Sequence, residues 1–243
     1  MKNLQDFYYK KFESDNYFNR WKENDNQEYI DATKGKLRKE KIKILNYLLS
    51  NLNIKNKEVL EIGCFVGDLL FFLKKNFKCN VKGVEASKKA CNFSKKFFNL
   101  KIENKIFIES EFFFINKKNY NKFDLIICDD VLSWIDRDAI IPTLSSIDWL
   151  LKDDGYLFLR DFTPSKNFAL RNHHYEKFKI YNFKQKNGHK SILLKSGKYI
   201  QIKNKTYLSK RFNKKNINYK EANIWSDTIL KKIKDFSHPI IKL

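Results

Sequence analysis

The stretch Glu58–Leu70 constrains this chain most, because it is written as a strand, a tight turn and the start of a helix. An apolar run ends in an acid at Glu61, passes Gly63 and Gly67, and continues into apolar residues with helical spacing. A glycine after the strand lets the backbone turn without a Cβ clash, and a second glycine lets a ligand approach main-chain N–H groups. The pattern predicts a cofactor-binding loop at the carboxyl end of a buried strand.

The charge and the spacing of this loop argue against a dinucleotide. Glu61 stands where it can face a cationic group, whereas a diphosphate would be repelled by an acid. The run Gly63–Gly67 also lacks the third glycine of the G-x-G-x-x-G spacing. A nicotinamide dehydrogenase is therefore only a distant alternative.

These residues resemble the first motif of the class I S-adenosylmethionine-dependent methyltransferases, in which an acid, one residue and then G-x-G-x-G close the first strand. Phe65 departs from the family, which usually has a small residue there. The resemblance implies S-adenosylmethionine as the cofactor. It also implies that the cofactor lies against Glu61, Gly63, Cys64, Phe65 and Gly67.

Two later segments extend the resemblance. Residues 81–85 read as a second strand, and Glu85 follows the loop by roughly twenty residues, where an acid accepts the ribose hydroxyls. Ala86, which comes next in the chain, is assigned to the cofactor with it. Residues 105–108 read as a third strand, and by resemblance the adenine is contacted at its end by Ser110, Glu111 and Phe112, with Glu109 open as an alternative to Glu111.

A third segment, residues 123–134, resembles the fourth strand of the family and the turn after it. Asp129 and Asp130 end this buried strand, at the sheet edge where Glu61 and Glu85 are also expected. We assign Asp129 to the cofactor and Asp130 to the acceptor side. Trp134 stands where the family frequently has a histidine.

The net charge of +21 suggests a polyanionic partner on its face, but its distribution favours a plainer interpretation. The basic residues are nearly all lysines spread through the chain, and arginines, which bind phosphates through two hydrogen bonds, are few. Nucleic acid is thus a less favoured partner.

The remaining composition predicts a soluble cytoplasmic protein without a metal site. No apolar run is long enough to span a bilayer. The cysteines lack C-x-x-C spacing and are expected to be reduced and buried: Cys64, Cys79, Cys91 and Cys128.

Strands and helices alternate over residues 53–162, which predicts an α/β fold with a doubly wound, Rossmann-like and mostly parallel sheet. Residues 1–52 read as an N-terminal helical cover, with Arg20 placed toward the cofactor. Residues 163–243 read as acceptor-side loops with an antiparallel edge in the same domain. Strand-like runs there cover 190–194 and 199–202, and 225–233 reads as a final helix.

The order Asp161, Pro164, His173-His174 and Tyr181 is similar to a type 11/12-like subgroup of small bacterial methyltransferases, many found with surface-saccharide or flagellar-glycan pathways. This implies a small polar acceptor, such as a saccharide or nucleotide sugar. His173, His174 and Asp130 are the candidate catalytic residues, although a structural role remains open for each histidine. The alternatives are an RNA or protein methyltransferase and a non-catalytic cofactor-binding scaffold.

Overall fold

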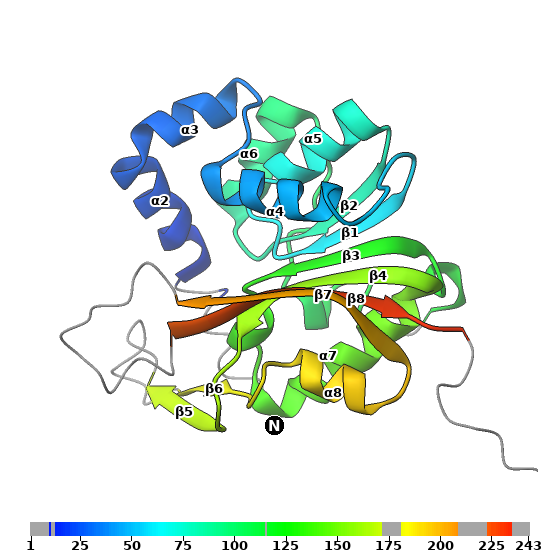
Figure 1. The fold of residues 1–243 in the computed structure, drawn as a ribbon. Coiled ribbons are helices and arrows are strands. Elements are labelled where there is room, and N and C mark those ends of the chain that lie inside the picture. Colours follow the sequence, from blue (N-terminus) through cyan, green and yellow to red (C-terminus); the bar gives the residue numbers. More distant parts are fainter. Residues whose placement is uncertain (1–9, 11–12, 115, 172–180, 209–222, 235–243) are drawn as a thin grey trace, which may run out of the picture. The chain divides into compact units, whose positions relative to one another are not determined.

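Parallel strand pairs joined by helices form the framework of this chain, as the computed structural model shows (Figure 1). The structure describes residues 10, 13–114, 116–171, 181–208 and 223–234. The chain divides into two compact units, residues 1–119 and 120–243.

The first unit is built on one strand–helix–strand repeat. Its strands β1 (Glu58–Ile62) and β2 (Asn80–Val84) are parallel and place Glu61 opposite Gly83. The helix α5 (Asp68–Phe77) joins them, and α6 (Lys88–Phe98) follows β2. The Ser87 hydroxyl accepts from the Ala90 N–H at 3.1 Å and caps α6, as the sequence predicts.

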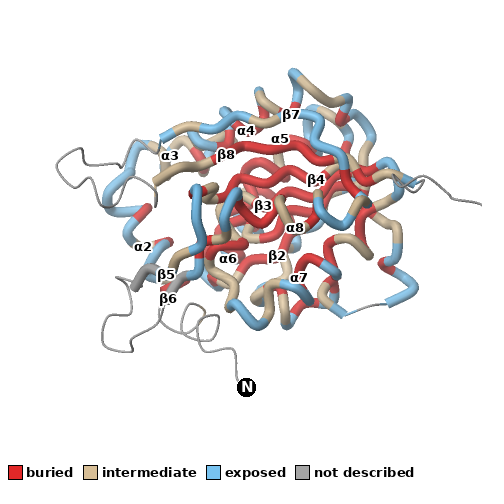
Figure 2. The backbone as a smooth tube through the Cα atoms, turned by 60° about the horizontal axis from the view of Figure 1, so that its bottom comes forward, coloured by how far each residue is buried: buried red, intermediate tan, exposed pale blue. Residues whose placement is uncertain are grey.

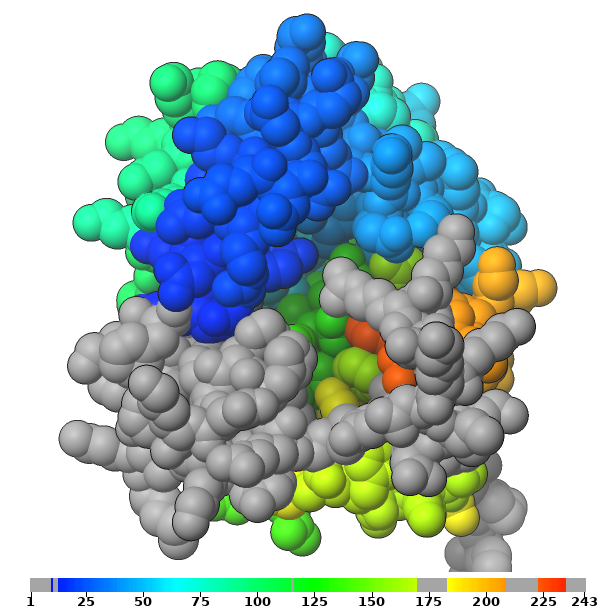
Figure 3. Space-filling view, turned by 90° about the vertical axis from the view of Figure 1, so that its left-hand side faces the viewer, coloured from blue at the N-terminus to red at the C-terminus, as the bar shows by residue number. Residues whose placement is uncertain are grey.

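Three helices precede β1 and confirm the helical cover for the part of the N-terminus that is described: α2 (Ser14–Asn24), α3 (Asn26–Thr33) and α4 (Lys39–Leu49). The dark blue α2 and α3 lie on the surface of the first unit (Figure 3). Phe18 and Trp21 of α2 are buried and pack edge-on or tilted against Phe65, at ring distances of 6.0 and 5.2 Å. Trp21 also meets Phe93 of α6 at 5.9 Å.

The second unit has a run of four described strands that combines one parallel pair with two antiparallel pairs. The strand order is β3-β4-β8-β7, in which β3 and β4 are parallel and the other neighbours are antiparallel. The bounds are β3 (Phe123–Asp129), α7 (Arg137–Leu150), β4 (Leu151–Phe162), β7 (Tyr199–Leu208) and β8 (Ile224–Lys232).

Burial distinguishes the middle of this sheet from its edge (Figure 2). The strand β8 is mostly buried and pairs on both sides, whereas β7 is mostly exposed. The helix α8 (Lys190–Lys195) lies on the same side of the strands as α7 (Figure 1). A separate antiparallel pair consists of β5 (Phe168–Arg171) and β6 (Tyr181–Lys184).

The predicted α/β class, with parallel strands and an antiparallel edge, is confirmed. Three local predictions are wrong. Residues 105–108 form no strand; a single parallel bridge joins Glu103 to Val84, and Phe107–Glu109 is a short 3-10 helix. Residues 190–194 belong to α8, and residues 225–232 lie in β8 rather than in a helix.

The error at β8 has a clear physical cause. Trp225, Ile229 and Ile233 recur every four residues, which indicates one face of a helix. In the structure, β4 and β7 supply hydrogen-bond partners on both sides of this segment, so pairing overrides the periodicity.

No helix among the described residues is long and apolar enough to cross a membrane. The predicted burial of Cys64, Cys79, Cys91 and Cys128 is confirmed, and all are free thiols.

We expect Trp21→Ala to lower the free energy of unfolding of the first unit by about 3–5 kcal/mol, because it removes the indole that joins α2 to Phe65 and Phe93. Thermal and urea unfolding followed by circular dichroism measure the effect. Ile30→Ala on α3 is the control, because Ile30 is exposed and should change stability little. Equal stability of the two variants would show that the aromatic cluster does not hold α2.

Candidate active site

The loop after β1 has the backbone that its sequence predicts. Gly63, Phe65 and Gly67 all have positive φ, at 70°, 53° and 70°. The N–H groups of Gly63 and Cys64 donate to the Val84 carbonyl at 2.8 and 3.2 Å. A Cβ on Gly67 would lie 2.7 Å from a methyl carbon of Ile102, so both conformation and space require glycine there.

Phe65 occupies a left-handed conformation that costs a non-glycine residue about 1–2 kcal/mol. Its ring is buried against α2, and the Arg38 guanidinium carbon lies 4.7 Å from the ring centroid. The bulk that departs from the family motif therefore points into the helical cover, and these contacts offset the strain.

Glu85, the predicted ribose partner, is fixed against this loop. One carboxylate oxygen accepts from the Phe65 N–H at 2.9 Å and the other from the Ser87 N–H at 2.8 Å. Burial raises the pKa of Glu85, and these hydrogen bonds oppose the rise. Each oxygen keeps a lone pair for a further donor, as a ribose hydroxyl would require.

Glu61 is fully buried at the end of β1, and Lys41 of α4 donates to it at 2.5 Å. Asp68, at the start of α5, accepts from the Arg38 guanidinium at 2.9 and 3.1 Å. Burial opposes the charge of Arg38, but the Asp68 carboxylate outweighs it and raises the arginine pKa. These two cation–carboxylate pairs join the start of α4 to Glu61 before the loop and to Asp68 after it.

Sequence analysis missed Arg38 and Lys41 as partners of the loop. Arg38 is the extended residue just before α4, and Lys41 lies in the first turn of this helix, so no helical periodicity links the two. Only the packing of this helix start shows that both cations meet acids rather than solvent.

The three residues predicted to contact the adenine lie in the first unit, and their side chains differ in burial. The Ser110 hydroxyl is buried and donates to the Phe107 carbonyl at 2.7 Å, and Phe112 is in the core. Glu111 is exposed, and its N–H donates to Glu103 at 3.1 Å.

Ala86 and Arg20 are the remaining first-unit residues assigned to the cofactor. The Ala86 carbonyl accepts from the Asn104 amide at 2.8 Å, beside the Glu85 turn. The Arg20 side chain is 44% exposed and forms an ion pair with Glu13, the residue before α2.

Asp129 in the second unit belongs to a row of charges across three strands. Arg160 of β4 lies beside it at 3.4 Å and also binds both carboxylate oxygens of Asp227 on β8, at 2.8 and 3.1 Å. The strand register puts these residues opposite one another. Arg160 thereby neutralises carboxylates that would be costly to bury without a cation.

Asp130 follows β3 with a φ of 56°, and its N–H donates to the Arg160 carbonyl at 3.0 Å. The Ser133 hydroxyl donates to its carboxylate at 3.1 Å. Burial raises the pKa of Asp130 to about 7, with Lys184 opposing the rise and Asp129 reinforcing it. Asp130 is thus poised to exchange a proton near neutral pH.

Two further side chains, Lys184 and His189, lie near Asp130 and Asp161. Sequence analysis did not assign either of them to the site. Lys184 at the end of β6 is buried, with its ammonium 3.5 Å from the Phe162 ring centroid. Burial lowers the Lys184 pKa to about 8, although both aspartates oppose this. His189 hydrogen-bonds Asp161. The predicted bases His173 and His174 lie outside the described residues.

The fold and the acid-bearing loop define a nucleoside-binding α/β enzyme of the methyl-transferring kind, and comparison with known proteins agrees. A family model described as a methyltransferase domain matches residues 34–217. The chain therefore belongs to the class I S-adenosylmethionine-dependent methyltransferases, as its motifs predict, and S-adenosylmethionine is its cofactor.

Solved structures share the fold. A Burkholderia thailandensis 1,6-didemethyltoxoflavin N1-methyltransferase, crystallised with its 1,6-didemethyltoxoflavin and S-adenosylhomocysteine, has a TM-score of 0.57 at 14% identity and covers 90% of this chain and 86% of that one. The N-methyltransferase NodS of Bradyrhizobium japonicum, with S-adenosylhomocysteine, has a TM-score of 0.53 at 13% identity over 80% and 86%.

A relative found by sequence aligns with a smaller share of this chain. An uncharacterized protein of Rickettsia prowazekii is 31% identical over 108 residues, which are 44% of this chain and 43% of that protein. The chain thus aligns with under half the length of this relative.

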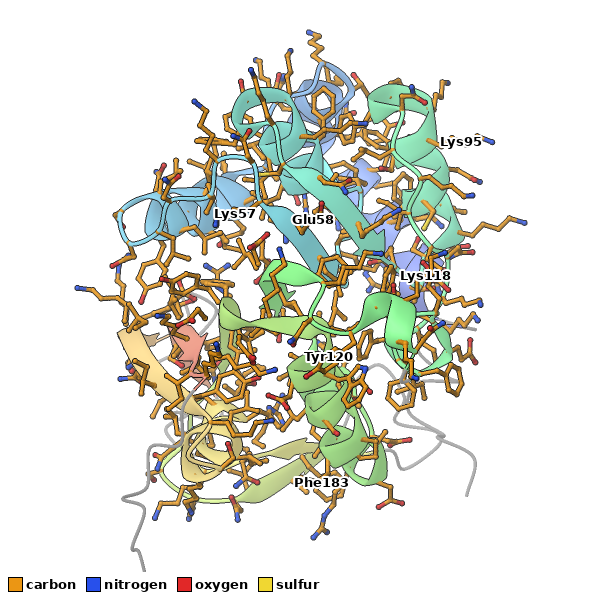
Figure 4. All side chains as sticks on the ribbon, turned by 90° about the vertical axis from the view of Figure 1, so that its right-hand side faces the viewer. Lys57, Glu58, Lys95, Lys118, Tyr120 and Phe183 are labelled. Carbon is orange, nitrogen blue, oxygen red and sulfur yellow. The ribbon has the colours of Figure 1, made fainter. Side chains whose placement is uncertain are left out.

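We expect Glu85→Ala to weaken S-adenosylmethionine binding by about 1.5–3 kcal/mol, the scale of a hydrogen bond to a charged group. Isothermal titration calorimetry measures the affinity. Glu58→Gln is the control, because Glu58 lies at the amino end of β1, opposite to the Glu61 end (Figure 4). Wild-type affinity in Glu85→Ala would remove this residue from the cofactor site.

We expect Asp130→Asn to leave stability unchanged near pH 4 and to raise it by about 1–2 kcal/mol at pH 8. A raised carboxyl pKa contributes stability that is fully present below the unfolded value and is lost as pH rises through about 7. Thermal unfolding from pH 4 to 9 measures this. Asp138→Asn is the control, because Asp138 is exposed, and its stability should follow the wild-type pH dependence. The same wild-type pH dependence in Asp130→Asn would show that the pKa of Asp130 is not raised.

Proposed function

We propose that this methyltransferase acts on a small polar acceptor of the saccharide or nucleotide-sugar class, by O- or N-methylation. Glu61, Gly63, Cys64, Phe65 and Gly67 hold the cofactor in this proposal together with Glu85. Asp130, with His173 and His174, serves the acceptor. Bound S-adenosylmethionine supplies an electrophilic methyl group on a sulfonium sulfur.

The residues of the first unit suit this cofactor. Glu85 is held by two backbone N–H groups in a position to accept from hydroxyls, and the loop at Gly67 excludes a Cβ. Glu61 and Asp68 are anionic groups whose cations come from α4 and the residue before it. Carboxylates accept hydrogen bonds from hydroxyls and attract cations, and an S-adenosyl amino acid offers ribose hydroxyls, an ammonium group and a sulfonium to such acceptors.

One arrangement carries the acceptor class: polar and ionisable side chains gather at the ends of β3, β4 and β6 in the second unit. Asp130 accepts from the Ser133 hydroxyl, Asp161 binds His189, and Lys184 is buried. Burial also raises the pKa of Asp130 to about 7. A few convergent polar groups of this kind suit a hydrogen-bonding small molecule. The Burkholderia enzyme of the same fold acts on a small molecule, which supports the same class here.

The proposal is tested by incubating the protein with methyl-labelled S-adenosylmethionine and a panel of acceptors: UDP-glucose, UDP-N-acetylglucosamine, GDP-mannose and an amino-sugar nucleotide. We expect label on at least one sugar nucleotide, located by mass spectrometry. Gly67→Val, which meets Ile102, is the inactive control. Cofactor binding without transfer to any of these sugars would contradict the acceptor class.

Nucleic acid is the second candidate, favoured by the net charge of +21. Lysines of α6 are exposed, and Lys95 points away from the first unit (Figure 4). Phosphate contacts would make binding of transfer RNA fall steeply with salt, whereas a small-molecule enzyme should bind it weakly at physiological salt. Filter binding between 50 and 200 mM salt distinguishes the two.

A further inference from the structure

Asp161, near the end of β4, binds His189 through two hydrogen bonds. One Asp161 oxygen accepts from both the His189 N–H, at 2.7 Å, and the His189 ring Nδ1, at 2.8 Å. The other oxygen accepts from the Phe162 N–H at 2.8 Å. His189 is only 6% exposed, so this is a buried pair.

The turn that carries His189 is packed tightly on β4. The Asn187 N–H donates to the Pro164 carbonyl at 2.9 Å. Gly188 has a φ of 75°, and a Cβ there would lie 2.8 Å from a Thr163 methyl carbon and 3.1 Å from the Asp161 carboxylate. The imidazole is therefore positioned before any substrate arrives, as catalytic groups must be.

The hydrogen bond to Asp161 decides which ring nitrogen carries the proton. Burial would raise the Asp161 pKa, but His189 outweighs burial and holds it below its ordinary value, so the carboxylate accepts from Nδ1–H. In the neutral ring this leaves the lone pair on Nε2. No described residue hydrogen-bonds Nε2, so that lone pair is not used within the described part of the chain.

The charged groups around the pair come from several elements. Asp161 lies on β4, Lys184 on β6, Lys190 on α8, and Asp130 follows β3. Lys190 is directed to Asn204 and to Thr228, at 3.3 Å from the latter, rather than to the ring. Asp130 and Asp161 both stand at the carboxyl ends of strands, where α/β enzymes bind their ligands.

We propose that His189, oriented by Asp161, is the general base that takes the proton from the acceptor during methyl transfer. The inference rests on the proposed function and names a residue that neither the motifs nor the family match assigns. It predicts an acceptor with a removable proton, on a hydroxyl oxygen or a neutral amine nitrogen.

The step balances. The acceptor oxygen or nitrogen forms a bond to the methyl carbon while the bond from that carbon to sulfur breaks, and sulfur keeps the electron pair. The acceptor proton moves to Nε2, so the positive charge of the sulfonium ends on an imidazolium. Asp161 stabilises that imidazolium through the same Nδ1 hydrogen bond.

The experiment measures single-turnover transfer between pH 5 and 9 to whichever panel sugar nucleotide accepts label. We expect His189→Ala and His189→Gln to lower the rate by about 10²–10⁴-fold and to abolish the acid limb of the pH profile. Added imidazole should partly restore His189→Ala. Cofactor affinity should stay at the wild-type value, and exposed Lys186→Gln, on the same turn, should behave as wild type.

A spectroscopic measurement tests the pair without turnover. Long-range ¹H–¹⁵N correlation spectra should show the Nδ1–H tautomer for His189 in wild type, and Asp161→Asn should shift it while keeping the fold. An Nε2–H tautomer in wild type would overturn the inference. So would a wild-type rate and pH profile in His189→Gln, or loss of the acid limb in His173→Ala or His174→Ala instead.

These outcomes separate the inference from the proposed function. Absence of cofactor binding by the wild-type protein would overturn the proposed function itself. Wild-type transfer that persists in folded His189→Gln would overturn only the assignment of the base.

Discussion

The structure depends on how it compensates its buried carboxylates, which lie at strand ends, at the start of α5 and within β8. An isolated charge there would cost several kcal/mol, so each acid needs a cation or donors. Glu61 is paired with Lys41, Asp68 with Arg38, and Asp227 with Arg160, while Glu85 and Asp161 accept backbone N–H groups. These partners fix loop positions as well as charge, which is why the acids serve both stability and binding.

In the first unit, this compensation joins the cover helices to the cofactor loop. Arg38 binds Asp68 through its guanidinium and also lies over the Phe65 ring. Phe65 adopts a strained backbone and its ring packs against Phe18 of α2, so this helix supports the loop. The departure of Phe65 from the family motif is therefore matched by a local change in packing rather than by loss of the loop.

In the second unit, burial shifts the pKa values of one carboxyl group and one ammonium group toward neutral pH. Asp130 and Lys184 have pKa values of about 7 and 8, because burial disfavours both charges and their mutual attraction only partly restores them. Asp161 differs because three donors hold it ionised. One strand end thus has a fixed carboxylate that orients a histidine, and the neighbouring one has a carboxylate able to exchange protons.

The sequence by itself determined the loop, the parallel strands and the family, because glycines, strand-ending acids and apolar periodicity are local signals. Its spacing put Glu61, Gly63 and Gly67 at the turn after one strand and Glu85 directly after the next, which is where the structure has them. Tertiary structure decided that residues 224–232 form a strand paired on both sides, and that Lys41 and Arg38 meet acids 20 and 30 residues away. It also placed His189 on Asp161, 28 residues earlier. No local pattern encodes these contacts, because they arise only when distant segments pack and the buried charges must find partners.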